Sequence, residues 1–111
     1  MRTFATGATS NDDTDKLDFE GFLSPLLLHE FAKYMHRNRH LDDGTLRASD
    51  NWQAGIPQSE HIKSAWRHFF DWWDLHRANN GRYSRAALIE ALCGVIFRAM
   101  GYLHEELKVK E

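Results

Sequence analysis

The sequence predicts an all-α fold, a small helical bundle of about three main helices. Apolar residues recur at spacings of three and four in three separate segments, which is the pattern of a helix with one packed face. Each of these segments is bounded by residues that start helices or form turns. The chain has 111 residues, enough for one domain with a modest core, so we expect no second domain.

The first residues of the chain predict no stable structure of their own. Residues 1–15 are rich in Thr, Ser, Gly, Asn and Asp and hold too few apolar side chains to join a core, so we expect a flexible N-terminal segment. The ordered domain is expected over residues 16–108. It begins with KLDFEGF, whose alternating apolar and charged residues predict a short extended segment lying along the helices.

The first main helix is predicted from Pro25 to about His40. Ser24 can cap the free amides at its start, and proline suits the first helical position. Its expected core stripe is Leu28, Phe31, Ala32 and Met35. Residues 41–58 then show no periodicity and contain many turn formers, so they predict a long loop, which in a small domain is usually functional or disordered. Trp52 argues against disorder, because its large ring needs a surface to cover.

The second main helix is predicted from about Ser59 to His76, with two different faces. One face is a stripe that we expect to be buried, and another is a charged row. The stripe is Ile62, Ala65, Trp66, Phe69, Phe70 and Trp73, and the row is Lys63, Arg67, Asp71 and Asp74. Within one turn, Arg67, His68 and Asp71 offer a guanidinium, an imidazole and a carboxylate, a grouping that suits phosphate or a phosphate-bound metal.

A turn is predicted at Asn79, Asn80 and Gly81, followed by a third main helix that Ser84 caps and that reaches about Lys108. Its apolar stripe is Leu88, Leu92, Val95, Ala99 and Leu103, with Ile96 beside it, and the opposite face holds Glu90, Gly94, Phe97 and Gly101. Glycine inside a helix costs about 1 kcal/mol relative to alanine, and close approach of another helix is the usual compensation. A helix covered on two sides predicts a homo-oligomer, a dimer or higher, that completes the bundle. The alternative is that this second face packs on the first helix of the same chain.

Composition excludes several functional classes. The formal charge is −2 with basic and acidic residues interleaved, so we expect no nucleic-acid partner. No apolar run approaches the roughly 20 residues of a membrane span, so we expect no membrane association. The single cysteine, Cys93, lies in an apolar run and has no partner for an internal disulfide, which indicates a buried thiol and a cytoplasmic protein.

Four motifs in their order along the chain point to a known family. KLDF, DNWQAGIP, WRHFFDWW and ALIEALCGVIFRAMGYLHEEL resemble the phage and bacterial dATP/dGTP diphosphohydrolase N-terminal domains, which are related to the all-α MazG-like nucleotide pyrophosphohydrolases. The resemblance covers residues 16–108. It implies a MazG-like, usually oligomeric fold that binds a purine nucleoside triphosphate through Mg²⁺ or Mn²⁺ and cleaves it to monophosphate and pyrophosphate.

The resemblance also implies a set of site residues. The metal ligands would be Glu30, Asp71 and Glu90, of which Asp71 and Glu90 would be catalytic. The expected substrate-binding residues are Lys16, Asp18, Asn51, Trp52, Arg67 and His68. Asn51 and Trp52 are the expected base-recognition pair, through an amide that reads the purine edge and an indole that stacks on its ring.

Each of these residues also has a simpler interpretation. Glu30 can pair with Lys33 or Arg37 on the helix surface, and Arg67 with Asp71. Trp52 can plug the bundle while Asn51 caps the second helix. MazG-like proteins usually carry paired acids, as E-x-x-E and E-x-x-D, and neither pair is intact here.

Three functions therefore stay open. The first is a metal-dependent diphosphohydrolase of purine nucleoside triphosphates. The second is a non-catalytic nucleotide-binding protein that sequesters a nucleotide-derived signal, for example one made by a bacterial immune system. The third is a helical interaction module without a small ligand.

Overall fold

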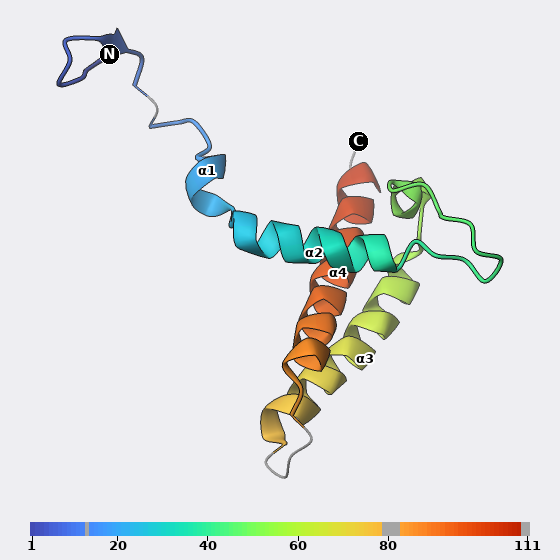
Figure 1. Cartoon of the computed structure of the whole chain (residues 1–111). Coiled ribbons are helices and arrows are strands. Elements are labelled where there is room, and N and C mark those ends of the chain that lie inside the picture. The colour runs from blue at the N-terminus through green and yellow to red at the C-terminus, as the bar shows by residue number, and fades with distance from the viewer. Residues whose placement is uncertain (13, 79–82, 110–111) are drawn as a thin grey trace.

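The computed structural model describes residues 1–12, 14–78 and 83–109, without the side chain of Val109. In these ranges the chain is mostly helical, as the sequence predicts, and a long central helix contacts the two other main helices and a short 3₁₀ helix. That helix is α4, Arg85–Val109. It packs beside α3, Gln58–Arg77, while α2, Pro25–Arg37, crosses it (Figure 1). The prediction of a small all-α bundle is confirmed.

The N-terminal residues form an arm that leads away from the helices (Figure 1). Two strands of two residues each, β1 (Arg2–Thr3) and β2 (Thr9–Ser10), pair antiparallel at its end. The described residues of the arm are exposed to solvent. The extended segment predicted for KLDFEGF is wrong in part, because Phe19–Phe22 forms a helical turn, α1. The carboxylate of Asp18 caps this turn by accepting a hydrogen bond from the Gly21 amide at 3.0 Å, which the alternating pattern did not indicate.

Helix α2 begins where the sequence predicts and ends three residues early. Ser24 Oγ accepts from the Leu27 amide at 3.2 Å, and Pro25 occupies the first helical turn. At the end of the helix, the Tyr34 carbonyl accepts from the Asn38 side chain at 2.8 Å as well as from the Asn38 amide at 3.2 Å. The Arg39 amide donates to the His36 carbonyl at 3.2 Å, a tighter i, i+3 bond of the kind that closes a last helical turn. The chain then doubles back, and the Arg47 amide donates to the Arg39 carbonyl at 2.9 Å.

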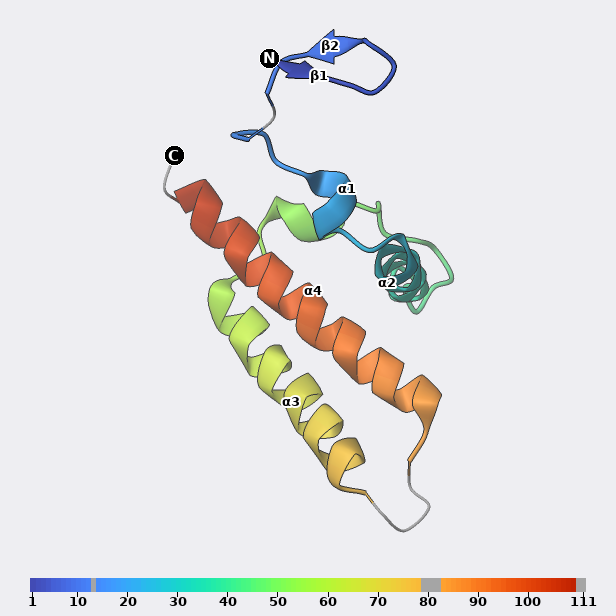
Figure 2. The ribbon, with the colours of Figure 1, turned by 90° about the vertical axis from the view of Figure 1, so that its left-hand side faces the viewer.

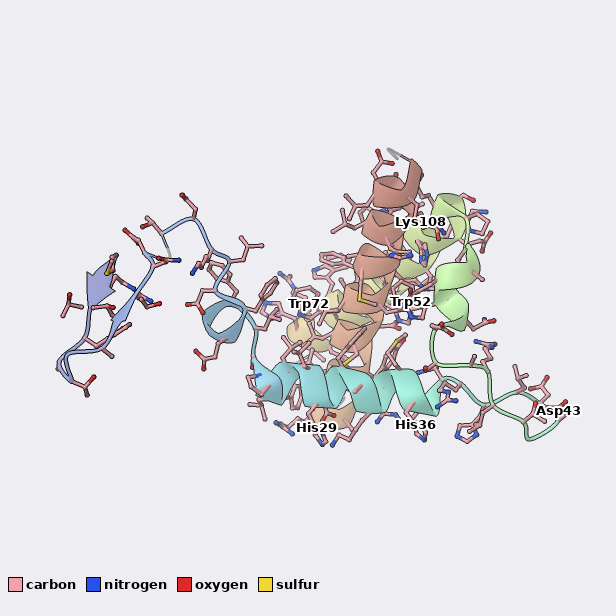
Figure 3. The ribbon with its side chains drawn as sticks, turned by 90° about the horizontal axis from the view of Figure 1, so that it is seen from above. His29, His36, Asp43, Trp52, Trp72 and Lys108 are labelled. Atoms are coloured by element: carbon pink, nitrogen blue, oxygen red, sulfur yellow. The ribbon has the colours of Figure 1, made fainter. Side chains whose placement is uncertain are left out.

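The long loop carries a short helix at its end. Asn51–Ala54 forms the 3₁₀ helix η1, which contacts α4. Lys108 Nζ on α4 donates to the Gln53 carbonyl at 3.2 Å, so the last turns of α4 hold η1 in place. Figure 3 labels Trp52 of η1 and Lys108 near the C-terminal end of α4. The loop is therefore ordered, as Trp52 indicated.

Helices α3 and α4 lie side by side and antiparallel, joined by a connection that includes residues outside the described ranges (Figure 2). The turn predicted at Asn79–Gly81 falls on these residues. Ser84 Oγ accepts from the Ala87 amide at 3.2 Å, so the predicted start of the third main helix is confirmed.

The glycines of α4 allow the close approach of α3, as predicted. A Cβ atom on Gly94 would lie 2.5 Å from the His68 ring, and one on Gly101 would collide with the His61 ring. The second face of α4 is thus covered by α3 of the same chain. The first helix does not provide this cover, so that alternative is wrong for these two glycines.

The core of the described chain is small, and the stripe predicted for α3 does not belong to it. Buried apolar residues are Tyr34, Ala91 and Cys93, and the buried polar ones are His61 and Ser64. The predicted stripe of α3 is largely exposed; Trp66, for example, is 66% accessible. The expectation that this stripe is buried is wrong within one chain. The reason is that α4 presents glycines, so the closest packing is reached by the His61 and Ser64 face of α3.

Two further core stripes also differ from expectation. Leu28 on α2 is 44% exposed and Leu103 on α4 is 57% exposed. Helix α2 crosses α4 rather than lying along it, so its contact with α4 is confined to the crossing. Cys93 is buried, as predicted.

Helix α4 is, by length and composition alone, apolar enough to cross a membrane, and among the described residues it is the one helix that is. The sequence expectation that no segment approaches this length is therefore corrected. Core helices of soluble proteins pass the same test, and α4 contacts α2, η1 and α3 within the chain. The cytoplasmic compartment stays a prediction.

Candidate functional site

A cavity of about 580 Å³ lies between the C-terminal half of α2, the loop that follows it, η1 and the middle of α4. Its walls thus come from segments that are distant in sequence. The early end of α2 matters here, because the chain turns back at Asn38 and brings residues 47–49 against the same space. This volume is within the roughly 300–1,000 Å³ that is typical of small-molecule sites.

Four arginines line the cavity, and no Asp or Glu is among its described lining residues. They are Arg37, Arg39, Arg47 and Arg98. His36 and His40 add two imidazoles to the same walls. Arg39 is fixed in place, because its Nε donates to the Arg47 carbonyl at 2.8 Å. Such a concentration of guanidinium groups favours a ligand with several negative charges, since each group can donate two hydrogen bonds to carboxylate or phosphate oxygens.

Arg98 is the most enclosed of the four arginines. Its guanidinium lies over the Phe97 ring, 4.9 Å from the ring centroid, and its Nη1 is 3.3 Å from His61 Nδ1. Its Nε is buried without a hydrogen-bond partner, and no carboxylate of the described chain forms an ion pair with it. Burial lowers the pKa of Arg98, and the nearby Tyr34 opposes this shift. An enclosed cation without a counterion is costly, and a bound anion would offset that cost.

Aromatic side chains form the remaining wall. Trp52 packs edge-on against Phe97 at a centroid distance of 6.0 Å, and its ring centroid is 5.0 Å from that of His104. Trp52 is partly exposed and lines the cavity together with Tyr34 and Phe97. The two sequence interpretations of Trp52 are therefore compatible: the indole packs on α4 and also borders the cavity.

Asn51 lies beside Trp52 in η1 and also lines the cavity. It does not cap α3, whose N-cap position is Pro57. The base-recognition pair predicted from the sequence is thus adjacent to the four arginines, which places stacking, amide and cationic groups around one space.

The grouping predicted on α3 lies elsewhere. Arg67 and Asp71 are exposed and do not line the cavity. His68 packs on Gly94 in the interface between α3 and α4. Burial lowers the pKa of His68, and the positive charge of Arg98 lowers it further. These three residues do not form one pocket, because His68 faces α4, whereas Arg67 and Asp71 lie one turn apart on an exposed side of α3.

Two of the three predicted metal ligands, Glu30 and Glu90, pair with cations of the same chain. Glu30 pairs with Lys33 at 3.0 Å, and Glu90 pairs with Arg37 at 2.8 Å. The hydrogen bond from Lys33 lowers the pKa of Glu30. Within the described residues, no group of three or more His, Cys, Asp or Glu side chains is placed to hold a metal ion. The described chain does not bring Glu30, Asp71 and Glu90 together as one cluster, and a Mg²⁺ or Mn²⁺ site stays a prediction.

The two remaining predicted ligand contacts lie on the arm. Lys16 and Asp18 are exposed, and neither lines the cavity. The carboxylate of Asp18 is engaged as the cap of α1. The structure therefore gathers Asn51 and Trp52 at the cavity and leaves Lys16, Asp18, Glu30, Arg67, His68, Asp71 and Glu90 outside its lining.

Sequence reasoning missed the four arginines. Arg98 had a usable signal, since it is a single cation inside the apolar run CGVIFRAMGYL of α4. Such a residue needs either a partner or a polar space. Arg37, Arg39 and Arg47 had no such signal, because the loop that brings them together has no periodic pattern.

Comparison of the chain with protein-family models, with curated proteins and with solved structures gives no match.

Proposed function

We propose that this chain binds a purine nucleotide, or a small molecule derived from one, in the cavity between α2, η1 and α4. One observation carries the proposal: four arginines share a cavity of about 580 Å³ with Trp52, and no Asp or Glu is among its described lining residues. Arg37 is the one of the four that pairs with a carboxylate of the described chain, Glu90 outside the lining. The ligand class is the one that the motif resemblance to dATP/dGTP diphosphohydrolase domains implies.

The phosphates are assigned to the arginine side of the cavity. A nucleoside triphosphate carries several negative charges, and guanidinium groups hold phosphate oxygens through paired, charge-assisted hydrogen bonds. Arg98 lines the cavity, and its guanidinium lies over the Phe97 ring. A phosphate there gains more than it would at the surface, because fewer water molecules screen the charges.

The base is assigned to the η1 side of the cavity. Indole rings stack on nucleobases, and stacking of this kind is worth about 1–3 kcal/mol per base. The Asn51 amide next to Trp52 can both donate and accept a hydrogen bond, as a purine edge requires. The contacts of Trp52 with Phe97 and His104 fix the indole and reduce the entropy lost on binding.

The geometry favours binding over hydrolysis. Cleavage between the α- and β-phosphates by the expected route needs several carboxylates that hold divalent ions, and Glu30 and Glu90 instead pair with Lys33 and Arg37. Charge neutralisation by arginine needs no metal. We therefore propose a protein that holds its nucleotide intact, as a sequestering protein would, with the diphosphohydrolase as the alternative.

Calorimetric titration tests the proposal. The ligands are dGTP, dATP and cyclic nucleotides, each with and without Mn²⁺, and deoxyguanosine serves as the phosphate-free control. We expect metal-independent binding of a phosphorylated ligand, no binding of the nucleoside, and recovery of intact nucleotide by chromatography. Metal-dependent conversion to monophosphate and pyrophosphate would establish the enzyme instead. Absence of binding by every phosphorylated ligand would overturn the proposal.

A further inference from the structure

A continuous apolar stripe on α3 has no cover within the described chain. Its large members are strongly exposed: Ile62 48%, Trp66 66%, Phe69 44%, Phe70 57% and Trp73 53%. An apolar groove of about 340 Å³ runs along this stripe. It is lined by Val95 of α4 and by four residues of α3, Ile62, Ala65, Trp66 and Phe69. In Figure 2, α3 forms one edge of the molecule, with α4 beside it.

The solvent-exposed area of this chain is larger than that of a compact monomer, as expected for a chain that packs against a partner. The chain exposes 8936 Å², whereas a compact monomer of 13.0 kDa exposes about 6,300 Å². The radius of gyration is 19.3 Å against about 13 Å for a compact chain of this length. The N-terminal arm accounts for part of the excess. Exposed apolar side chains also lie on α1, α2 and α4, and those of α3 form the stripe along the groove. Two such stripes in contact suit the obligate class of dimer interface, which buries roughly 2,000 Å² or more in total.

The partner that packs on the α3 stripe has to be bound permanently, because the hydrophobic core of one chain is too small to be stable without it. The described residues include three buried apolar side chains, Tyr34, Ala91 and Cys93. A partner that is needed for stability must be present whenever the chain is made, and a second copy always meets that condition. We propose that α3 packs antiparallel against α3 of a second copy of this chain, with the two stripes in contact.

The charged row beside the stripe fixes the direction of the pairing. At about 100° per residue, Lys63, Arg67 and Asp71 follow one flank of the stripe, with the cations nearer the start of α3. All three are exposed and have no ion pair in the part of the chain that the structure describes. Lys63, Arg67 and Asp71 are therefore available to a partner.

An antiparallel two-fold arrangement brings the two rows to the same side of the interface and in opposite order. With the axis near Phe69, Arg67 of each copy faces Asp71 of the other. A parallel pairing would place the rows on opposite sides and give no such complementarity. The two α3–α4 hairpins then form a four-helix arrangement, which is a stable way to cover two apolar helix faces.

Charge exchange between copies tests this pairing directly. In R67D two carboxylates face each other at each contact, and in D71R two guanidinium groups do, so each variant alone repels itself twice. We expect the wild-type chain to sediment at twice 13.0 kDa at micromolar concentrations. Each single variant should dimerise at least about tenfold more weakly. An equimolar mixture of the two variants should recover the wild-type dissociation constant. In the mixed dimer the two introduced side chains face each other, and so do the two original ones, so both contacts are between opposite charges.

The mixing step separates contacts between copies from contacts within one helix, since neither chain regains its own pair of Arg67 and Asp71. Circular dichroism of each variant shows that it is folded, and R85D, at the exposed start of α4, is the matched control that should dimerise like wild type. A wild-type chain that stays at 13.0 kDa overturns the proposal. So does a mixture of R67D and D71R that dimerises no better than its components.

Discussion

Arg98 and His61 meet where α3, α4 and the cavity adjoin, with Arg98 Nη1 3.3 Å from His61 Nδ1. A guanidinium can only donate hydrogen bonds, so Nδ1 is the acceptor and the proton of the imidazole lies on Nε2. His61 is fully buried, and burial followed by the charge of Arg98 lowers its pKa. A neutral histidine of α3 therefore holds the arginine that we assign to the phosphates.

The lowered histidine pKa values predict a stability that decreases in mild acid. His61 and His68 both have pKa values below the ordinary 6.5, so near and below that pH the unfolded chain binds more protons than the folded chain. Stability is then fully present above the unfolded pKa and is lost as the pH falls through it. Urea denaturation from about pH 8 to about pH 5.5, a window above the usual carboxylate range, measures this. H68Q should reduce the dependence and H29Q, on the exposed side of α2, should retain it. A free energy of unfolding that is constant across the window would contradict the assignment of neutral histidines.

Gly94 predicts a reversal of the usual effect of alanine in a helix. In an exposed helix, glycine to alanine stabilises by about 1 kcal/mol. Here the new Cβ would lie 2.5 Å from the His68 ring, so we expect G94A to destabilise the chain by about 1–3 kcal/mol. Removing the ring relieves the clash, so the double variant H68A/G94A should lose less stability than the two single losses combined. Thermal or chemical denaturation checks both, and a more stable G94A would contradict the packing of α3 on α4.

Glu90 separates the binding protein from the enzyme. Its pair with Arg37 at 2.8 Å is about half exposed, so E90Q should change the free energy of unfolding by less than about 1 kcal/mol. Since the substitution frees Arg37, which lines the cavity, nucleotide affinity should stay equal or increase. Calorimetry of E90Q beside wild type measures it. A loss of affinity would instead return Glu90 to the ligand site.

Trp52 tests the assignment of the base. We expect W52A to weaken nucleotide binding by about 1–3 kcal/mol, the value of one stacked base, while pyrophosphate binding changes little. W72A, on the exposed side of α3 away from the cavity lining, is the matched control and should bind both ligands like wild type. Equal losses for the nucleotide and pyrophosphate would show that Trp52 supports the cavity wall rather than the base.

The sequence predicted the main helices because their start signals are local. Ser24, Pro25 and Ser84 act on amides within one turn, and the glycines of α4 indicated a close helix neighbour. The sequence did not predict which face of a helix is buried, because that depends on which other helix packs against it. The stripe of α3 reads as core, yet Gly94 draws the His68 side towards α4 and leaves Trp66 exposed.

Only the part of the candidate site that is local in sequence was predictable. Asn51 and Trp52 stand out as a local pair in a turn-rich loop, and both line the cavity. The arginines come together only because the chain reverses after Asn38 and α2 crosses α4. No regular interval along the sequence links these arginines. Helical periodicity instead pointed to Arg67 on α3.

Comparison of two arginine variants tests the central claim most directly. R98Q removes the enclosed guanidinium of the cavity, and R67Q removes an exposed one outside its lining, so both lose the same charge. Calorimetric titration of each folded variant with the nucleotide that binds wild type, without metal, should show at least a tenfold loss for R98Q and wild-type affinity for R67Q. The reverse result, with affinity lost in R67Q and kept in R98Q, would place the ligand on α3 and contradict the assignment of the cavity.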